Sequence, residues 1–518
     1  MGLLMTRCVV AAGLLLGLSS TMRADPLVVK TRQGKVQGKT INNGKVLAWL
    51  GMPYAAPPTG DLRWRAPQPP APWSDLRDTT KYGAHCAQNP VFDDMIFQDD
   101  GLSEDCLFLN VYAPATAPGN ARLPVMFWIH GGGYEGGSSN EPRHNGDFLP
   151  LKNVILVTIN YRLGVFGFLA TSDLAKEGNG AAGNYGFMDM IAALEWVNKN
   201  IEKFGGNPKN VTIFGESAGS FAVSTLMASP LAKGLFHKAI GESGGALGQS
   251  ALPYTALSER EAKDAQWVAG LNVSSIAELR KLPTQTILDA AGKPGVSFPP
   301  DVDGKVLTEP VAETYAAGKQ AHIPLIAGWN ADEGSSYEKF GTVEQWKLKA
   351  QTDFGDRTFE FLKLYPGDTD AQARRSAIDY GSDQFIALGT WTWLEEHRKT
   401  GDAPTFRYHF EWPATPSKFH EGTFAFHSDD IEYVFGTLDT RPGFKVRPED
   451  RTLSDQMMTY WTNFAKTGNP NGGSLPKWPN YKDRGYPLIH LNSAITSGPD
   501  TQRERYLFLQ KGMPAGEF

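Results

Sequence analysis

One short stretch, residues 211–219, constrains the fold of this chain more than any other. It reads Val-Thr-Ile-Phe-Gly-Glu-Ser-Ala-Gly. Its first four residues, rich in β-branched and aromatic side chains, predict a buried strand, and the residues from Ser217 to Met227 predict a helix that stops before Pro230. Gly-x-Ser-x-Gly between a strand and a helix forms a sharp turn that exposes the serine. The stretch therefore predicts an α/β fold with Ser217 at the carboxyl end of a sheet.

Other segments fit the same architecture. Apolar runs of strand length occur at residues 125–129, 154–159, 323–327 and 405–410. Apolar residues recur at helical spacing in residues 190–204, and the order strand, helix, strand predicts a parallel sheet. Asn42-Asn43-Gly44 predicts the turn of a hairpin within residues 36–54. Residues 250–320 read as a mostly helical, polar insertion.

The composition is that of an ordinary globular protein. The chain has 518 residues, 41% of them hydrophobic and 20% charged, with a formal net charge of -6. These values exclude collagen-like, coiled-coil and disordered classes. No block of Lys and Arg stands out, so no nucleic acid partner is expected.

The first 24 residues read as a secretory signal peptide. Arg7 precedes an apolar run at residues 8–18, and a small and polar stretch leads to an expected cleavage near Ala24. The run is too short to span a bilayer, so we expect no membrane anchor and export to the periplasm or the medium. We expect residues 25–518 to form a single catalytic domain. Its two cysteines, an even number in an exported protein, suggest a disulfide.

A glycine-rich loop upstream of Ser217 supplies hydrogen-bond donors for acyl-transfer chemistry. Residues 130–133 read His-Gly-Gly-Gly and follow the strand at residues 125–129. Such a loop can turn backbone N–H groups toward a developing oxyanion. We assign the N–H groups of Gly132 and Gly133 to this oxyanion hole, with that of Ala218 as the third donor.

Two further motifs occur in the chain: Ser-Glu-Asp-Cys-Leu-Phe-Leu-Asn-Val-Tyr at residues 103–112 and Asn-Tyr-Arg-Leu-Gly-Val-Phe-Gly at residues 160–167. Together with the serine turn and the glycine loop, they closely resemble the type B carboxylesterases. This family is the cholinesterase-like branch of the α/β-hydrolases. The resemblance runs from Gly51 to at least Gly436. It implies an α/β-hydrolase fold, in which helices flank a large, mostly parallel central sheet and a helical insertion covers the active site. It also implies a disulfide between Cys86 and Cys106.

The resemblance completes a catalytic triad, in the chain order serine, acid, histidine. Residues 427–436 are similar to the family's histidine segment, with Asp430 where Glu is usual, so His427 is the expected base. The resemblance also favours Glu333 as the acid, although spacing alone does not separate it from Asp332. Ser243 matches a family position whose hydroxyl supports the acid or the histidine. The other histidines between residues 390 and 430 are His397, His409 and His420. Of these, His420 is the nearest rival to His427 as the base.

The resemblance implies a carboxylic ester hydrolase that needs no cofactor, with a small ester as its substrate. No metal-ligand spacing occurs, so no metal site is expected, and the chain is expected to be a monomer or a weak homo-oligomer. The rival hypothesis, a non-catalytic adhesion module, is disfavoured because all three triad residues are present. The aromatic residues between the two cysteines are Phe92 and Phe97. Choline-binding members of the family carry a Trp there, so choline esters are disfavoured, and aliphatic and aromatic esters both remain open.

Overall fold

The computed structural model describes residues 25–117, 120–248, 252–416 and 424–512. The predicted signal peptide and His420 lie outside the described residues. Within them, no helix is long and apolar enough to cross a membrane.

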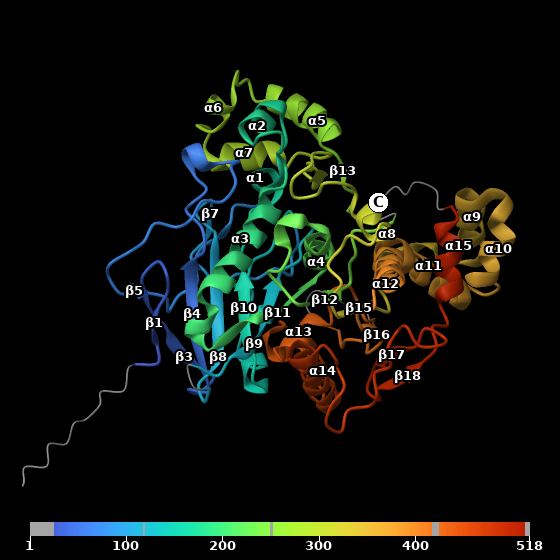
Figure 1. Cartoon of the computed structure of the whole chain (residues 1–518). Helices are drawn as coiled ribbons and strands as arrows, with labels where there is room; N and C mark the ends of the chain where they lie inside the picture. The colour runs from blue at the N-terminus through green and yellow to red at the C-terminus, as the bar shows by residue number, and fades with distance from the viewer. Residues whose placement is uncertain (1–24, 118–119, 249–251, 417–423, 513–518) are drawn as a thin grey trace, which may run out of the picture.

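The described residues contain one 11-stranded sheet, which forms the centre of the molecule (Figure 1). In spatial order its strands are β18 (Thr496–Gly498), β17 (Leu488–Leu491), β16 (Thr405–Phe410), β15 (Leu325–Asn330), β12 (Lys238–Glu242), β11 (Gly206–Glu216), β9 (Leu123–Ile129), β10 (Ile155–Ile159), β8 (Phe108–Pro114), β4 (Val46–Pro53) and β3 (Lys39–Ile41). Every pairing from β17 to β10 is parallel, whereas the strands at the two edges pair antiparallel. The predicted mostly parallel α/β sheet is therefore confirmed.

Two hydrophobic cores lie on opposite faces of this sheet. In β9, Val125, Phe127 and Ile129 join the larger core, whereas Met126 and Trp128 join the smaller one. Successive side chains of a strand point to opposite faces, so a strand covered on both sides is apolar throughout. Helices α3 (Tyr185–Asn200) and α4 (Ala218–Ala228) supply the larger core, and α13 (Ile431–Phe435) and α14 (Pro448–Thr467) supply the smaller one.

The predicted hairpin is confirmed only in its inner part. β3 and β4 pair antiparallel across Asn42, Asn43 and Gly44, all of which have positive φ. The segment before them differs from the prediction, because β2 (Lys35–Gln37) leaves the main sheet and pairs with β1 (Val28–Lys30) and β5 (Arg77–Asp78).

Two further groups of helices are present. The predicted insertion between β12 and β15 is present as α5 (Leu257–Ala269), α6 (Ile276–Leu279), α7 (Thr284–Ala291) and α8 (Val311–Ala316). A second group was not predicted: α9 (Val343–Phe354), α10 (Thr358–Leu364), α11 (Asp370–Ser382), α12 (Leu388–Thr400) and α15 (Arg503–Gln510). Figure 1 shows α9, α10 and α15 together at the right edge of the molecule. Their shared core of aromatic rings includes Phe354, Phe361, Tyr380 and Phe508.

Candidate active site

Ser217 occupies a strained turn between β11 and α4. Its backbone has φ 52° and ψ -124°, a conformation that side-chain-bearing residues rarely adopt. The flanking glycines are required by close packing: a Cβ at Gly215 would lie 2.6 Å from the carbonyl oxygen of Ile129, and one at Gly219 would lie 2.0 Å from it. The turn from Gly215 to Gly219, which we call the elbow, thus packs against the end of β9. Its strained backbone places the serine hydroxyl at the carboxyl end of the sheet.

The structure brings Ser217, His427 and Glu333 into one chain of contacts. His427 Nε2 lies 2.9 Å from Ser217 Oγ, and His427 Nδ1 lies 2.6 Å from Glu333 Oε2. Glu333 follows β15, and His427 precedes α13, so neighbouring segments at one end of the sheet carry all three groups. Glu333 is buried, whereas 26% of the His427 side chain is exposed.

The second oxygen of Glu333 is also held in place. Glu333 Oε1 accepts hydrogen bonds from Ser243 Oγ at 2.6 Å and from the backbone N–H of Asn330 at 2.8 Å. Ser243 directly follows β12, beside β15 in the sheet. These two donors fix the carboxylate plane, so its other oxygen points at His427.

The alternative candidates for the acid and the base of the triad have other partners. Asp332 forms an ion pair with Arg375 at 2.5 Å and accepts a hydrogen bond from the backbone N–H of Ala425. His397 Nε2 lies 2.9 Å from the carbonyl oxygen of Ile323, and His409 Nδ1 lies 2.8 Å from a carboxylate oxygen of Glu411. None of these three contacts Ser217 in the described part of the structure.

The glycine loop packs against the elbow. A Cβ at Gly131 would lie 2.8 Å from the carbonyl oxygen of Glu216, and one at Gly132 would lie 2.2 Å from that of Gly136. Gly132 and Gly133 have φ +99° and +65°, so glycine is needed for both space and conformation. Within the described residues, the N–H groups of Gly132, Gly133 and Ala218 have no acceptor in the protein, which leaves them available to a ligand.

Glu216 is a site residue that sequence reasoning missed. Its Oε1 lies 3.3 Å from His427 Nε2 and accepts a hydrogen bond from Ser428 Oγ at 2.5 Å. The acidic residue directly before Ser217 was visible in the sequence. Its contact with a histidine more than two hundred positions away was not.

Buried acids control the charge of His427. Burial of the imidazole by itself lowers its pKa, but the nearby charges of Glu216 and Glu333 outweigh burial and raise the pKa of His427 to about 9. Burial raises the pKa of Glu216 to about 7 and that of Asp430 to about 6. The two carboxylates therefore stabilise the imidazolium form of His427, which is the form the ring takes once it has received a proton.

Two cavities border the glycine loop. One of about 210 Å³ is lined by Gly131, Gly132, Ser217 and His427, and its apolar wall consists of Phe92, Met95 and Ile431. The other, of about 780 Å³, is lined by Gly133 and Tyr134 and by residues of the helical insertion, including Trp267 and Phe298. The glycine loop thus lines two cavities, and the smaller one contains Ser217 and His427.

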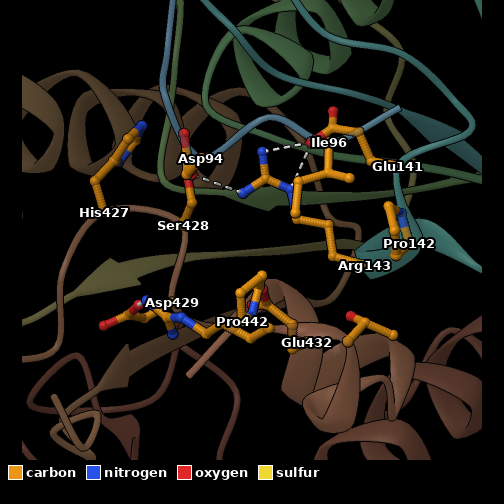
Figure 2. Close-up of a pocket in the computed structure, with 12 residues that line it drawn as sticks. Asp94, Ile96, Glu141, Pro142, Arg143, His427, Ser428, Asp429, Glu432 and Pro442 are labelled. Atoms are coloured by element: carbon orange, nitrogen blue, oxygen red, sulfur yellow. Dashed lines mark hydrogen bonds and ion pairs between the residues drawn. The ribbon is translucent and has the colours of Figure 1, made fainter. Parts of the chain in front are cut away.

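The disulfide loop forms part of the smaller cavity. The disulfide between Cys86 and Cys106 is present, which confirms the prediction, and Phe92 and Met95 belong to the loop that it closes. Figure 2 shows the adjoining pocket, where Asp94 of this loop and Glu141 flank Arg143. The loop therefore contributes apolar side chains to the cavity beside Ser217 and a carboxylate to the adjoining pocket.

Comparisons with known proteins identify the family of this chain. The family model described as the carboxylesterase family matches residues 25–508. The chain is 37% identical to carboxylesterase 1D of Rattus norvegicus, over 89% of this chain and 89% of the relative. It is 35% identical to para-nitrobenzyl esterase of Bacillus subtilis, over 94% of this chain and 99% of the relative. A solved structure of PNB esterase matches with a TM-score of 0.79 and 33% identity, over 93% of this chain and 100% of that chain. The chain therefore belongs to the carboxylesterase family and is a carboxylic ester hydrolase with the α/β-hydrolase fold.

Proposed function

We propose that the protein is an exported serine carboxylesterase that works through an acyl-enzyme. The contact chain from Ser217 Oγ through His427 to Glu333, with distances of 2.9 and 2.6 Å, carries this proposal. A hydroxyl becomes a nucleophile at neutral pH when an adjacent base accepts its proton and a third group orients that base.

The proposed reaction has two halves. Ser217 Oγ attacks the ester carbonyl carbon while His427 Nε2 takes the hydroxyl proton, and the oxyanion is bound by the N–H groups of Gly132, Gly133 and Ala218. His427 then protonates the departing alkoxide, which leaves as the alcohol. In the second half, water attacks the acyl-enzyme, His427 takes its proton and returns it to Ser217, and the carboxylic acid is released. Glu333, held by Ser243, orients His427 throughout.

For the substrate we propose small or aromatic carboxylic esters. The apolar wall of Phe92, Met95 and Ile431 beside Ser217 suits an aromatic or short aliphatic group. The name of the Bacillus subtilis relative, para-nitrobenzyl esterase, points to the same class. The loop from Cys86 to Cys106 has no Trp to bind a quaternary ammonium, which disfavours choline esters.

The proposal also includes processing and location. We propose that residues 1–24 are removed as a signal peptide and that residues 25–518 act as a single catalytic domain. The match of one family model to residues 25–508 and the disulfide are both compatible with this proposal.

Substitution of Ser217 tests the mechanism. We expect Ser217→Ala to lose nearly all hydrolysis of p-nitrophenyl acetate while it keeps the circular dichroism spectrum of the parent. An organophosphate should label the parent once per chain and the variant not at all. Ser454→Ala is a matched control, because Ser454 Oγ donates to the carbonyl oxygen of Tyr433 outside the site. Retained turnover and labelling in Ser217→Ala would overturn the proposed nucleophile.

A graded panel of aryl and alkyl esters tests the substrate class. We expect kcat/KM to be highest for small acyl groups and aryl alcohols, and lower for choline esters. A preference for choline esters would contradict the proposed class while leaving the mechanism intact.

A further inference from the structure

Three ligating side chains converge in a place that the proposed mechanism does not use. His409 and His490 each direct Nδ1 at the same oxygen of Glu411, at 2.8 and 2.6 Å. The ligand atoms of the three residues all lie within 4.8 Å of one another. His427, Glu333 and Ser217 are not members of this group, and the ester hydrolysis proposed above assigns it no role.

The sheet itself creates this arrangement. β16 and β17 run parallel, and their register places His409 directly beside His490. Neighbouring positions on paired strands point to the same face, and so do positions two apart on one extended segment, which brings Glu411 to the same side. Both strands belong to the central sheet, and the backbone N–H of Glu411 donates to the carbonyl oxygen of Leu491. The three side chains are therefore held on a rigid platform before any ligand arrives.

From this placement we propose that His409, Glu411 and His490 form a binding site for a zinc-class transition-metal ion. Two imidazole nitrogens and one carboxylate oxygen form a donor set that Zn²⁺ accepts at about 2.0–2.2 Å, with a fourth position left for water. In a tetrahedral site with such bond lengths, donor atoms lie about 3.3 Å apart. The two distances to Glu411, 2.8 and 2.6 Å, would open toward this value, and the ligand atoms of the three residues lie within 4.8 Å of one another. Mg²⁺ and Ca²⁺ prefer oxygen donors and suit this set poorly.

The surroundings fit a bound ion. The exposed fractions of the Glu411 and His490 side chains are 29% and 27%, which leaves a path for the ion and room for its water. His409 is more enclosed, at 10%, and its ring stands edge-on to Trp329 of β15 with centroids 6.2 Å apart. An apolar neighbour of this kind restricts the orientation of a ligating imidazole. The ion would join β16 to β17 through side chains in addition to the backbone pairing.

The sequence could not reveal this site. Glu411 and His490 are 79 positions apart, and His409, two positions before Glu411, is the only one of the other two ligands close to it in the chain, so no compact metal-binding spacing appears. The absence of such a spacing led to the expectation of no metal site, and the proposed site departs from that expectation.

Zinc titration of the full chain tests the proposal. After dialysis against EDTA and then buffer, ZnCl₂ is titrated in competition with a chromophoric chelator, and Co²⁺ is added separately to record its visible absorption. We expect one Zn²⁺ per chain at this site and cobalt bands typical of a four-coordinate nitrogen and oxygen site. We expect His490→Gln and the near-isosteric Glu411→Gln to weaken Zn²⁺ binding by at least ~100-fold, because the first removes a ligating imidazole and the second replaces the charged carboxylate with a neutral amide.

Two matched controls locate the bound ion. His322→Gln removes a histidine that contacts the carbonyl oxygen of Gly318, and it should leave Zn²⁺ binding unchanged. His427→Gln removes the histidine of the active site, and the proposed site should persist in it. Zn²⁺ at 100 times its dissociation constant should raise the melting temperature of the parent by on the order of 3 °C, and Mg²⁺ should not.

Several results would overturn the proposal. One is no Zn²⁺ binding by the parent, and another is equal binding by the parent and both ligand variants. A third is loss of binding in His427→Gln alone, which would place the ion at the active site. Because Glu411→Gln preserves side-chain volume, it keeps the test decisive if His490→Gln fails to fold. In either of the first two cases, the three residues form a hydrogen-bonded cluster only.

Discussion

Glu216 Oε1 lies 3.3 Å from Nε2 of His427, the same nitrogen that lies 2.9 Å from Ser217 Oγ. His427, the proposed general base, is thus placed between two carboxylates, because Glu333 contacts its other nitrogen at 2.6 Å. Glu333 orients the ring, whereas Glu216 acts on the charge of the nitrogen that exchanges protons with the serine. The two acids therefore predict different consequences on substitution.

Replacing Glu216 by Gln should shift the pH dependence of the reaction. Only neutral His427 can accept the serine proton, so the acid limb of kcat/KM follows its pKa in the free enzyme. The charges of Glu216 and Glu333 raise that pKa to about 9, and loss of one charge lowers it. We expect the acid limb of Glu216→Gln to move to lower pH by about 1 unit. We also expect kcat on the plateau to fall about 10-fold, because the imidazolium of the transition state loses a partner.

The control for this measurement is Glu202→Gln. Glu202 is exposed and pairs with Arg122 away from the site, so its variant should keep the parent pH profile. A Glu216→Gln variant whose acid limb coincides with that of the parent would show that Glu216 does not set the pKa of His427.

Replacing Gly132 by Ala should disable the proposed oxyanion hole. A Cβ at this position would lie 2.2 Å from the carbonyl oxygen of Gly136, so the loop has to move and its N–H groups lose their alignment. Loss of one such donor costs ~10²–10³ in rate, and we expect kcat of Gly132→Ala to fall by at least ~100-fold. Gly44→Ala is the control: it also has positive φ but has open space around it, far from Ser217. Equal kcat in the two variants would contradict the role of the loop.

Replacing Ser243 by Ala should loosen Glu333 without removing any group of the triad. The variant loses the 2.6 Å hydrogen bond to Glu333 Oε1 but keeps the bond from the Asn330 N–H. A hydrogen bond to a charged group contributes about 1.5–3 kcal/mol, so we expect kcat to fall by about 10-fold or more. KM should change little, because Ser243 does not line the cavity beside Ser217. Restored kcat in Ser243→Thr would support a positioning role, and an altered KM with unchanged kcat would argue against it.

Removing the disulfide should affect both stability and substrate binding. Cys86 and Cys106 are 20 positions apart, and closing a loop of this length stabilises a folded chain by about 3 kcal/mol. We expect the double variant Cys86→Ala, Cys106→Ala to lose free energy of unfolding of that order in a denaturant titration. We also expect a higher KM for aryl esters, since Phe92 and Met95 of the loop line the cavity beside Ser217. The reduced parent provides the comparison, and unchanged stability and KM in both would contradict this role.

Much of the central sheet was predictable because its strands are locally distinctive. β9, β10 and β16 coincide with their predicted segments to within about two residues, since strands covered on both faces are continuously apolar. The helices α9 to α12 were not predicted. Their core of Phe354, Phe361 and Tyr380 forms only when several amphipathic segments pack together.

The sequence by itself determined the elbow around Ser217, the glycine loop at residues 130–133 and the family. Those features depend on residues adjacent in the chain, where turn geometry and strand patterning act locally. It left Glu333 and Asp332 equivalent by spacing, and it gave no sign of Glu216 beside His427 or of His409 beside His490. Only the tertiary structure decided these relationships, because the order and register of parallel strands bring together side chains that lie more than 200 positions apart.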